Sequence, residues 1–490
     1  MLNIAIFLPL LTGLVVLVVP QDRPALVRWI SLGGSMLTLL VTLGLWIGFD
    51  PAGGLQSRAV LPWIPSIGAT YDVAITGISL PLIVLTALLL TLVALFVLHE
   101  HDRAHAHAFL FLLLGTGLLG VFAAQDLLLF YLFFEVGLVP MYFIIGIWGG
   151  EQRGYAALKF FLYTRVGSLA MLLGFLLLYL SMAPHSFSLP AIIAAQPLAQ
   201  SPATAALVFF ALLLCFGVKL PTVPLHNWLP DAHVEAPTEG SVMLAGLLLK
   251  MGAYGLVTVL LPTLPGTVGR FGWLLVALAL LSMIYGALAA LAQSDMKRLV
   301  AYTSINHMGY VTLAVAIAAM VPDGAVRQLA LDGAVVQMVS HGLLTGGMFL
   351  VIGILQHQAG TRELDRFGGL IGQLPSFSLL FGLLAFGSLG LPGLPGFIAE
   401  FQVIGASLQL SVWVAGAAVL GLVITTAVYL RLMAGVLMGA PTVVSEGLRL
   451  PARHQLWAGI VLAASAVLVG VLPGLLVAAI DGTTRLLARF

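Results

Sequence analysis

Residues 204–229, TAALVFFALLLCFGVKLPTVPLHNWL, form a long apolar run that a Pro-x-x-Pro pair interrupts. A second run with the same interruption occupies residues 374–403. Each run is long enough to cross a bilayer, which takes about 20 apolar residues, but proline lacks the backbone N–H that a continuous helix needs. The helix-breaking residues are Pro221, Pro224, Pro392 and Pro395. Two broken apolar helices in corresponding positions indicate an inverted-repeat membrane protein with its ion site at the breaks.

The composition requires a lipid environment. Hydrophobic residues make up 61% of the 490 residues and charged residues only 8%, whereas a soluble domain is about 25% charged. A soluble chain this apolar could not cover its surface with polar groups. The net charge of +1 gives no reason to expect nucleic-acid binding, and a single cysteine, Cys215, excludes an internal disulfide. We therefore expect an integral membrane protein.

The apolar runs predict an all-α polytopic fold with about fourteen membrane-spanning helices. The runs are 2–19, 28–48, 77–98, 107–124, 126–149, 157–182, 204–229, 241–261, 272–292, 298–320, 329–356, 374–403, 411–437 and 455–481. The first run lacks a basic region and a cleavage site, so we interpret it as a spanning helix rather than a signal peptide. Residues 50–76 are too polar and too rich in proline and glycine to span, and we expect an exposed loop or a short hairpin there.

The two proline breaks divide the chain into repeats of opposite orientation. We assign residues 107–261, helices 4–8, to the first inverted repeat, and residues 272–437, helices 9–13, to the second. Residues 1–106 then hold helices 1–3, and residues 455–490 hold the C-terminal helix 14. Helices 7 and 12, which carry the breaks, would cross the membrane in opposite directions.

The basic residues predict the orientation. Eleven lysines and arginines lie in loops that follow odd-numbered helices, and five lie in the other loops and the C-terminal tail. Because loops rich in lysine and arginine stay in the cytoplasm, both termini are expected on the outer side of the membrane. A bacterial inner membrane is the expected location.

Six titratable residues lie inside the predicted helices, near the centre of the bilayer. They are Glu135, Lys219, Lys250, His307, His341 and Glu400. Helix rise places several of them roughly 14–18 Å from a membrane surface, where an ionisable side chain costs about 2.5–3.5 kcal/mol on insertion scales. They form a layer parallel to the membrane, which suits a proton relay in which each group changes the charge felt by its neighbour.

A purely structural interpretation of these residues competes with the relay. For one lone residue, a hydrogen-bonded role in helix packing is as good an explanation as a functional role. Two lysines and two glutamates at one depth, beside two broken helices, favour the relay. Glu135 and Lys219 carry opposite charges in one repeat, and an ion pair between them would keep both ionised. Arg165, inside the sixth helix, could reach the surface or pair with an acid, and the sequence does not decide between these.

Two polar clusters outside the spanning helices have open interpretations. The loop after the third helix could bind a metal or be a solvated loop; its histidines are His99, His101, His105 and His107. The loop after the seventh helix could collect protons, dock a partner or be solvated; its residues are Asp231, His233, Glu235 and Glu239. The chain has no phosphate-binding glycine loop and no cysteine cluster for an Fe–S centre, so we expect no redox cofactor or metal in this chain.

Three motifs resemble the antiporter-like membrane subunits of complex I, the NADH:quinone oxidoreductase. They are 217–254, GVKLPTVPLHNWLPDAHVEAPTEGSVMLAGLLLKMGAY; 131–144, YLFFEVGLVPMYFI; and 295–310, DMKRLVAYTSINHMGY. The resemblance extends over nearly the whole chain. Glu400, in the segment LPGLPGFIAEF, makes the subunit 4 type, called chain M in bacteria, the most similar, because the related antiporter chains usually carry lysine there.

The resemblance implies a role for each membrane residue of the first repeat. Glu135 corresponds to the glutamate of helix 5 that partners the lysine of helix 7. Lys219 corresponds to that lysine, the primary proton carrier, and Lys250 to the connecting lysine of helix 8. Arg165 departs from the family, in which an uncharged residue is expected.

The resemblance also implies the outlet and the wider assembly. His307 and His341 correspond to polar-axis positions in helices 10 and 11, and Glu400 to the outlet-side acid of helix 12. Quinone reduction, NADH, FMN and Fe–S clusters would belong to other subunits, and the other antiporter-like chains would be partners. A subunit of a multisubunit sodium/proton antiporter or of an energy-converting hydrogenase is the alternative; the quinone, the electron donor and the proton stoichiometry stay open.

Overall fold

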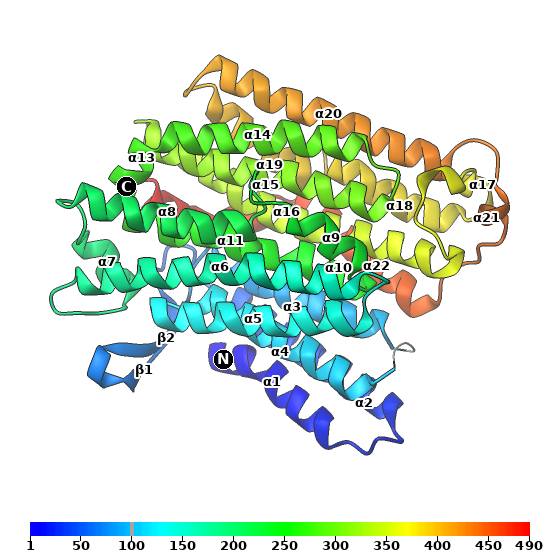
Figure 1. The fold of residues 1–490 in the computed structure, drawn as a ribbon, viewed down its shortest axis with the longest axis horizontal. Coiled ribbons are helices and arrows are strands. Elements are labelled where there is room, and N and C mark those ends of the chain that lie inside the picture. Colours follow the sequence, from blue (N-terminus) through cyan, green and yellow to red (C-terminus); the bar gives the residue numbers. More distant parts are fainter. Residues whose placement is uncertain (99–101) are drawn as a thin grey trace.

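The computed structural model describes residues 1–98 and 102–490 and is almost entirely helical (Figure 1). In these residues, twelve helices are long and apolar enough to cross a membrane. They are α2 (Pro24–Ile47), α3 (Ser79–Phe96), α4 (Ala104–Ala123), α5 (Leu127–Trp148), α6 (Arg153–Leu180), α8 (Pro202–Lys219), the segment from α10 to α12 (Thr238–Thr263), α14 (Gly272–Leu291), α15 (Met296–Met320), α16 (Gly324–Ala359), α20 (Val412–Leu437) and α22 (Arg453–Val471). The shorter apolar helices α1 (Leu2–Val18) and α18 (Pro375–Ser388) complete the expected spans, which confirms the predicted polytopic fold.

Both helix breaks occur at the proline pairs. Helix α8 ends at Lys219, and a non-helical segment precedes α9 (Trp228–Glu235). Likewise α18 ends at Ser388, before α19 (Pro395–Ser407) begins. Side chains bind free backbone groups at the first break: Trp228 Nε1 donates to Val218 O at 2.8 Å, and Val223 N donates to Ser282 Oγ at 2.9 Å. Irregular backbone at membrane depth is tolerated only where protein satisfies it in this way.

The eighth predicted span contains two widened turns. It starts as α10 (Thr238–Met243), passes through a π-helical turn at Leu244–Leu248, and continues as α11 (Leu249–Gly255). A second π-helical turn, Leu256–Leu260, leads into α12 (Leu261–Thr263). A π-turn inserts an extra residue into a helix and is found frequently at functional sites. No feature of composition distinguishes these turns from ordinary helix.

The polar stretch after α2 forms the expected hairpin. Strand β1 (Gln56–Ile64) pairs antiparallel with β2 (Ala69–Ile75) across a short 3₁₀ turn, Pro65–Ile67. Arg58 donates to both carboxylate oxygens of Asp72, at 2.9 and 2.7 Å. The hairpin lies beside both chain ends, because Tyr71 Oη donates to Asn3 Oδ1 at 3.0 Å and a Cβ on Gly482 would lie 2.0 Å from Pro51 O.

The C-terminal run is divided into two helices. The helix expected over residues 455–481 ends with α22 at Val471, and α23 (Gly474–Leu487) follows. Pro473 explains the division, because a residue before proline avoids the helical conformation and Leu472 has φ −119° and ψ 58°. Helix α23 is tied to the start of α16: Thr484 Oγ1 donates to Asp332 Oδ1 at 2.6 Å.

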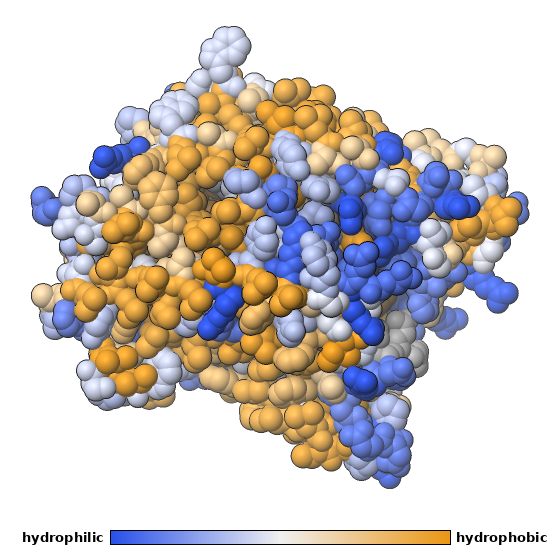
Figure 2. Space-filling model, in the orientation of Figure 1, coloured by the Kyte–Doolittle hydropathy of each residue, from blue (hydrophilic) through white to orange (hydrophobic). Residues whose placement is uncertain are grey.

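Short helices lie in the loops between the long ones. They are α7 (Leu189–Ala195), α13 (Pro265–Arg270), the 3₁₀ turn Leu364–Arg366, α17 (Leu370–Gln373) and α21 (Val443–Glu446). Figure 2 shows hydrophilic residues gathered at the end of the bundle near α9, α10 and α17, and an apolar surface over most of the remaining face. Such a distribution fits a bundle surrounded by lipid along its length, with one strongly polar end.

Glycines allow the backbones of central helices to approach closely. A Cβ on Gly252 of α11 would lie 2.6 Å from Phe216 O and 2.8 Å from Leu220 N, where α8 ends. We expect Gly252→Ala to destabilise the protein by about 1–3 kcal/mol, because overpacking against backbone forces the two helices apart. The measurement is the thermal denaturation temperature of the detergent-solubilised protein. Gly416→Ala in α20, where nothing lies within 4 Å, is the control and should be neutral; equal effects of both changes would contradict the close contact.

Candidate functional site

The six predicted membrane residues all lie inside the helical bundle. Five of them are buried, with exposed fractions of 0–4%: Lys219, Lys250, His307, His341 and Glu400. The sixth, Glu135 on α5, retains 16% exposure of its side chain. The structure brings four of the six together in one connected chain and leaves Glu135 and Lys219 outside it.

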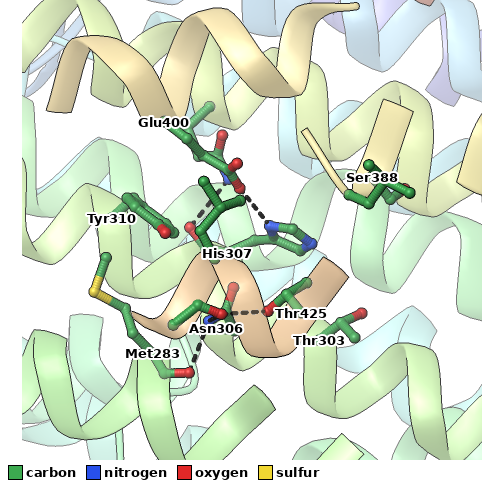
Figure 3. Close-up of polar contacts among 12 residues, drawn as sticks. Met283, Thr303, Asn306, His307, Tyr310, Ser388, Glu400 and Thr425 are labelled. Carbon is green, nitrogen blue, oxygen red and sulfur yellow. Dashed lines mark hydrogen bonds and ion pairs between the residues drawn. The ribbon is translucent and has the colours of Figure 1, made fainter. Parts of the chain in front are cut away.

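The connected chain begins at Lys250 and ends at Glu400. Lys250 Nζ of α11 lies 2.6 Å from His341 Nδ1 of α16, and because an ammonium group only donates, the ring nitrogen accepts. The rings of His341 and His307 follow, with centroids 5.9 Å apart. His307 Nδ1 of α15 lies 3.0 Å from Glu400 Oε1 of α19, as the dashed line in Figure 3 shows. Residues from four helices thus form one polar line inside the bundle.

A small cavity lies beside the two histidines. The volume open to the centre of a water molecule is about 10 Å³, close to the minimum that one water needs. Its polar lining residues are His307, Gln337, Ser340, His341, Thr345 and Ser388. One water among these groups would bridge the two imidazoles, which are in ring contact but have no direct hydrogen bond within the described part of the chain.

The π-turn explains how Lys250 is held. Where this turn ends, Leu249 N bonds back to Leu244 O, five residues earlier instead of four. The widened turn exposes the Ala245 carbonyl, which accepts a hydrogen bond from Lys250 Nζ. The carbonyl and the imidazole together offset part of the cost of burying the ammonium group.

Glu135 forms its ion pair with Arg165 of α6 and not with Lys219. Arg165 Nη1 donates to Glu135 Oε2. The arginine side chain lies at the surface of the bundle, on α6 beside α5, and is 40% exposed. Arg165 therefore pairs with an acid, which the sequence alone did not decide. The expected ion pair of Glu135 with Lys219 is not formed: Arg165 binds Oε2 of the carboxylate from the neighbouring helix, and Oε1 has no hydrogen-bond partner among the described residues.

Lys219 lies among aromatic rings. Its Nζ atom has no hydrogen-bond partner among the described residues. The nearest rings are Phe134, with its centroid at 5.1 Å, and Phe160, at 5.5 Å. Successive residues on a helix point about 100° apart. The orientation of α5 that directs Glu135 toward Arg165 therefore directs its neighbour Phe134 toward Lys219. Cation–π contacts of this kind are worth about 2 kcal/mol when desolvated.

The acidic loop after the first break is neither freely solvated nor a single cluster. Asp231 Oδ2 accepts from Lys159 Nζ at 2.6 Å, and Glu235 Oε2 accepts from Gln152 N at 2.8 Å. Glu239 is buried with His107, whose Nε2 lies 2.9 Å from Glu239 Oε1. Their partners come from other loops and helices, so the sequence could not reveal these pairs.

The histidines after α3 have separate surroundings where the structure describes them. His105 Nε2 lies 3.0 Å from Val19 O, and His107 contacts Glu239. His99 and His101 lie outside the described residues. Within those residues, no group of three or more His, Cys, Asp or Glu side chains is placed to hold a metal ion.

Comparisons with known proteins give consistent matches. The family model described as "NADH:quinone oxidoreductase/Mrp antiporter, TM" matches residues 124–425. NADH-quinone oxidoreductase subunit M of Rhodobacter capsulatus is 39% identical over 455 residues, which cover 90% of this chain and 86% of that relative. NAD(P)H-quinone oxidoreductase chain 4 2 of Thermosynechococcus vestitus is 40% identical over 406 residues, 82% of this chain and 74% of the relative. A chain of respiratory complex I from Thermus thermophilus with bound NADH matches with a TM-score of 0.90 at 30% identity, covering 100% of this chain and 99% of that one.

The ion pair of Arg165 and Glu135 can be tested by a double-mutant cycle. Arg165→Leu leaves a largely buried carboxylate without its charged donor, so we expect a loss of about 1–3 kcal/mol. Once Glu135→Gln is present, the same arginine change should cost less, because the two effects are coupled. Thermal denaturation of the wild-type protein, the single variants and the double variant measures the coupling, and Arg165→Lys should retain part of it. Additive losses in the cycle would contradict the ion pair.

Proposed function

The chain belongs to the NADH:quinone oxidoreductase/Mrp antiporter family of membrane proteins, and from that premise we propose a mechanism for it as the subunit M or chain 4 type of complex I. It is a proton-translocating membrane subunit of an NADH:quinone oxidoreductase. Within it, the six titratable groups move protons through the bilayer centre. The single observation that carries this mechanism is the polar line from Lys250 through His341 and His307 to Glu400, in which only the step between the two imidazoles lacks a direct hydrogen bond in the described structure.

Each group of the line can exchange a proton with the next. Imidazole accepts a proton on one ring nitrogen and releases one from the other, so His341 and His307 can pass a proton without large movement. Lys250 supplies the proton at one end, and Glu400 receives it at the other. A proton on His307 strengthens its contact with the ionised Glu400 and repels charge on His341, which gives the transfer a direction.

The energies are compatible with such a relay. Moving one charge across 100 mV is worth about 2.3 kcal/mol. One pKa unit corresponds to about 1.36 kcal/mol. A change of partner that shifts the pKa of a group by two units is therefore enough to move one charge against this potential. Breaking and forming one ion pair at membrane depth changes the free energy by this amount or more.

The first repeat supplies a second group of carriers. Lys219 is placed at the end of α8, beside the helix break, and has no competing hydrogen bond in the described structure. We assign to Lys219 the uptake and release of one proton. Both steps are controlled by whether Glu135 remains in its ion pair with Arg165. Helix α11 joins this group to the polar line, because Gly252 packs directly on Lys219 and Leu220 and Lys250 of the same helix contacts His341 of the second repeat.

The chain's surroundings follow from the same family. As a subunit of a larger complex it contacts other membrane subunits, which we propose to be the other antiporter-like chains. We propose a bacterial inner membrane, with both termini on the periplasmic side, from the distribution of basic residues and the bacterial relatives. NADH, FMN, Fe–S clusters and quinone are assigned to other subunits, so this chain would act as a non-redox translocase.

The family also includes antiporter chains, the alternative raised above together with the hydrogenase subunits. The complex I assignment rests on the relatives named as subunit M and chain 4 and on Glu400, whose pairing with His307 uses the negative charge of a carboxylate. A lysine at this position could not form that ion pair.

Lys219→Ala and Lys250→Ala test the two lysine carriers. We expect each variant to assemble but to lose proton pumping and coupled quinone reduction at least tenfold, because alanine cannot carry a proton. NADH-driven proton uptake in inside-out vesicles and quinone reduction measure both effects, and a native gel measures assembly. Lys159→Ala, a lysine outside the relay near the membrane surface, is the matched control. Wild-type pumping in either relay variant would remove that lysine from the mechanism.

Glu400→Gln tests the end of the polar line. Glutamine keeps the size of the side chain and can accept a hydrogen bond from His307, but it cannot receive a proton. We expect pumping to fall at least tenfold with assembly unchanged, whereas Glu400→Asp should retain part of the activity. Proton uptake at matched complex content is the measurement. If the glutamine and aspartate variants pump equally well, Glu400 acts only as a packing residue.

A further inference from the structure

The pair of His307 and Glu400 lies beside buried polar side chains that the relay does not use. Three of them belong to α15, and each is 0% exposed: Thr303, Asn306 and Tyr310. Their spacing of three and four residues places them on one face of the helix, and His307 follows Asn306 directly in the sequence. Figure 3 shows the ring of His307 directed toward Glu400, with Asn306 on the side of α20.

Asn306 and Tyr310 bind the main chain of two neighbouring helices. Asn306 Nδ2 donates to Met283 O of α14 at 2.7 Å and also reaches Gly421 O of α20 at 3.5 Å. Tyr310 Oη donates to Ala418 O of α20 at 3.1 Å. Main-chain carbonyls within a helix move only with that helix. These bonds therefore fix the rotation of α15 about its axis relative to both α14 and α20.

The polar character of Asn306 is not explained by packing. Its Oδ1 atom has no hydrogen-bond partner among the described residues. A buried polar atom without a partner destabilises a folded protein, and a leucine of similar size would avoid this cost. Polar side chains that bond across membrane helices hold the helices together, and one buried polar side chain can fix the register of packed helices. We therefore relate Asn306 to the orientation of α15.

Helix α20 also contacts the second helix break, which carries Glu400. Thr426 Oγ1 of α20 donates to Leu389 O at 3.4 Å, directly after α18 ends. A Cβ on Gly390 would lie 2.9 Å from Glu400 Oε2 and 3.3 Å from Leu422 Cδ1 of α20. The carboxylate and α20 thus lie against the same residue of the break. One helix therefore supports both the histidine and the glutamate of the pair.

We propose that Asn306 and Tyr310 are positioning residues for the proton transfer between His307 and Glu400. Neighbouring residues on a helix point about 100° apart, so fixing Asn306 also fixes the direction of His307. The bonds to α14 and α20 keep His307 Nδ1 at 3.0 Å from Glu400 Oε1, within the reach that proton transfer needs. Without these bonds α15 can turn and lengthen that contact. The proposal rests on the proposed function, because it assumes that His307 and Glu400 carry protons.

The first test removes the two bonds and keeps side chains of similar size. In the intact complex, the double variant Asn306→Leu with Tyr310→Phe should assemble and lose NADH-driven proton uptake at least fivefold. The ratio of uptake rates in ordinary and heavy water should rise, because proton transfer at His307 then limits the rate. Thr312→Val is the matched control, since Thr312 is also buried on α15 and its hydroxyl has no partner in the described structure. It should keep the wild-type rate and ratio.

Two outcomes of this test would overturn the proposal. One is wild-type uptake by the double variant. The other is reduced uptake with the wild-type ratio in heavy water, because that result means fewer active complexes and not a slower proton transfer. If the double variant fails to assemble, Tyr310→Phe alone decides by the same measurements, since it removes a single oxygen atom.

The second test displaces α20 and leaves α15 unchanged. A Cβ on Gly421 would lie 3.2 Å from Met283 Cβ and 3.3 Å from Asn306 Nδ2. The larger side chain of Gly421→Val must therefore push α20 away from α14 and α15, and we expect reduced uptake with the same rise of the rate ratio. Gly416→Val, on the same helix where nothing lies within 4 Å of a Cβ, is the control. Equal uptake by the two variants would overturn the role of α20.

His307→Ala, measured alongside, separates the positioning residues from the relay itself. If His307→Ala stops uptake while the double variant and Gly421→Val keep the wild-type rate and ratio, the positioning role is overturned and the relay stands. If His307→Ala pumps at the wild-type rate, the proposed function of the relay fails. Loss in all three, with a raised rate ratio in the double variant and in Gly421→Val, supports both.

Discussion

The cost of placing a charge in a medium without water controls how this protein is built. An isolated ion at membrane depth is expensive unless an opposite charge, a carbonyl or an aromatic ring compensates it. Each buried ionisable group of the relay meets this demand differently: Glu400 through His307, Lys250 through a carbonyl and His341, and Lys219 through two phenylalanine rings. These three kinds of compensation tolerate a change of protonation to different degrees. The need to compensate buried charge therefore also determines which groups of the proposed relay can exchange protons.

The irregular helices place these groups where compensation is possible. The proline break ends α8 at Lys219, so the lysine lies at a helix terminus and not within a continuous hydrogen-bonded cylinder. The π-turn before Lys250 provides the carbonyl that holds its ammonium group. Regular helices would leave no backbone acceptor free at that depth, because each carbonyl would be used within its own helix. Proline breaks and π-turns therefore serve the same purpose, which is to make backbone polar groups available inside the membrane.

The sequence predicted the features that depend on neighbours along the chain and missed those that depend on neighbours in space. Apolar length and the proline pairs located the spans and the breaks, and burial of the polar residues at mid-membrane depth followed from helix rise. The partner of Glu135 depends on how α5 is rotated about its axis relative to α6. A shift of one residue along a helix changes the direction of a side chain by about 100°, and no pattern in the sequence determines that rotation. The sequence places His233 in an acidic loop because Asp231, Glu235 and Glu239 surround it; the folded chain shows that the loop turns its histidine inward, onto Phe349.

The two repeats differ in how their titratable groups contact one another, and this difference has a mechanistic consequence. In the second repeat and at its junction with the first, the groups touch, so a proton can move by small changes of hydrogen bonding. In the first repeat, Lys219 Nζ lies near two aromatic rings and has no hydrogen-bond partner among the described residues, and its expected counter-ion is paired with Arg165. A proton can leave or reach Lys219 only after Glu135 exchanges partners or water enters the break at the end of α8. Arg165 lies partly exposed on the outer face of α5 and α6, where a neighbouring subunit or lipid can act on it. In the proposed relay, the step that depends on Arg165 is thus also the step most open to control from outside the chain.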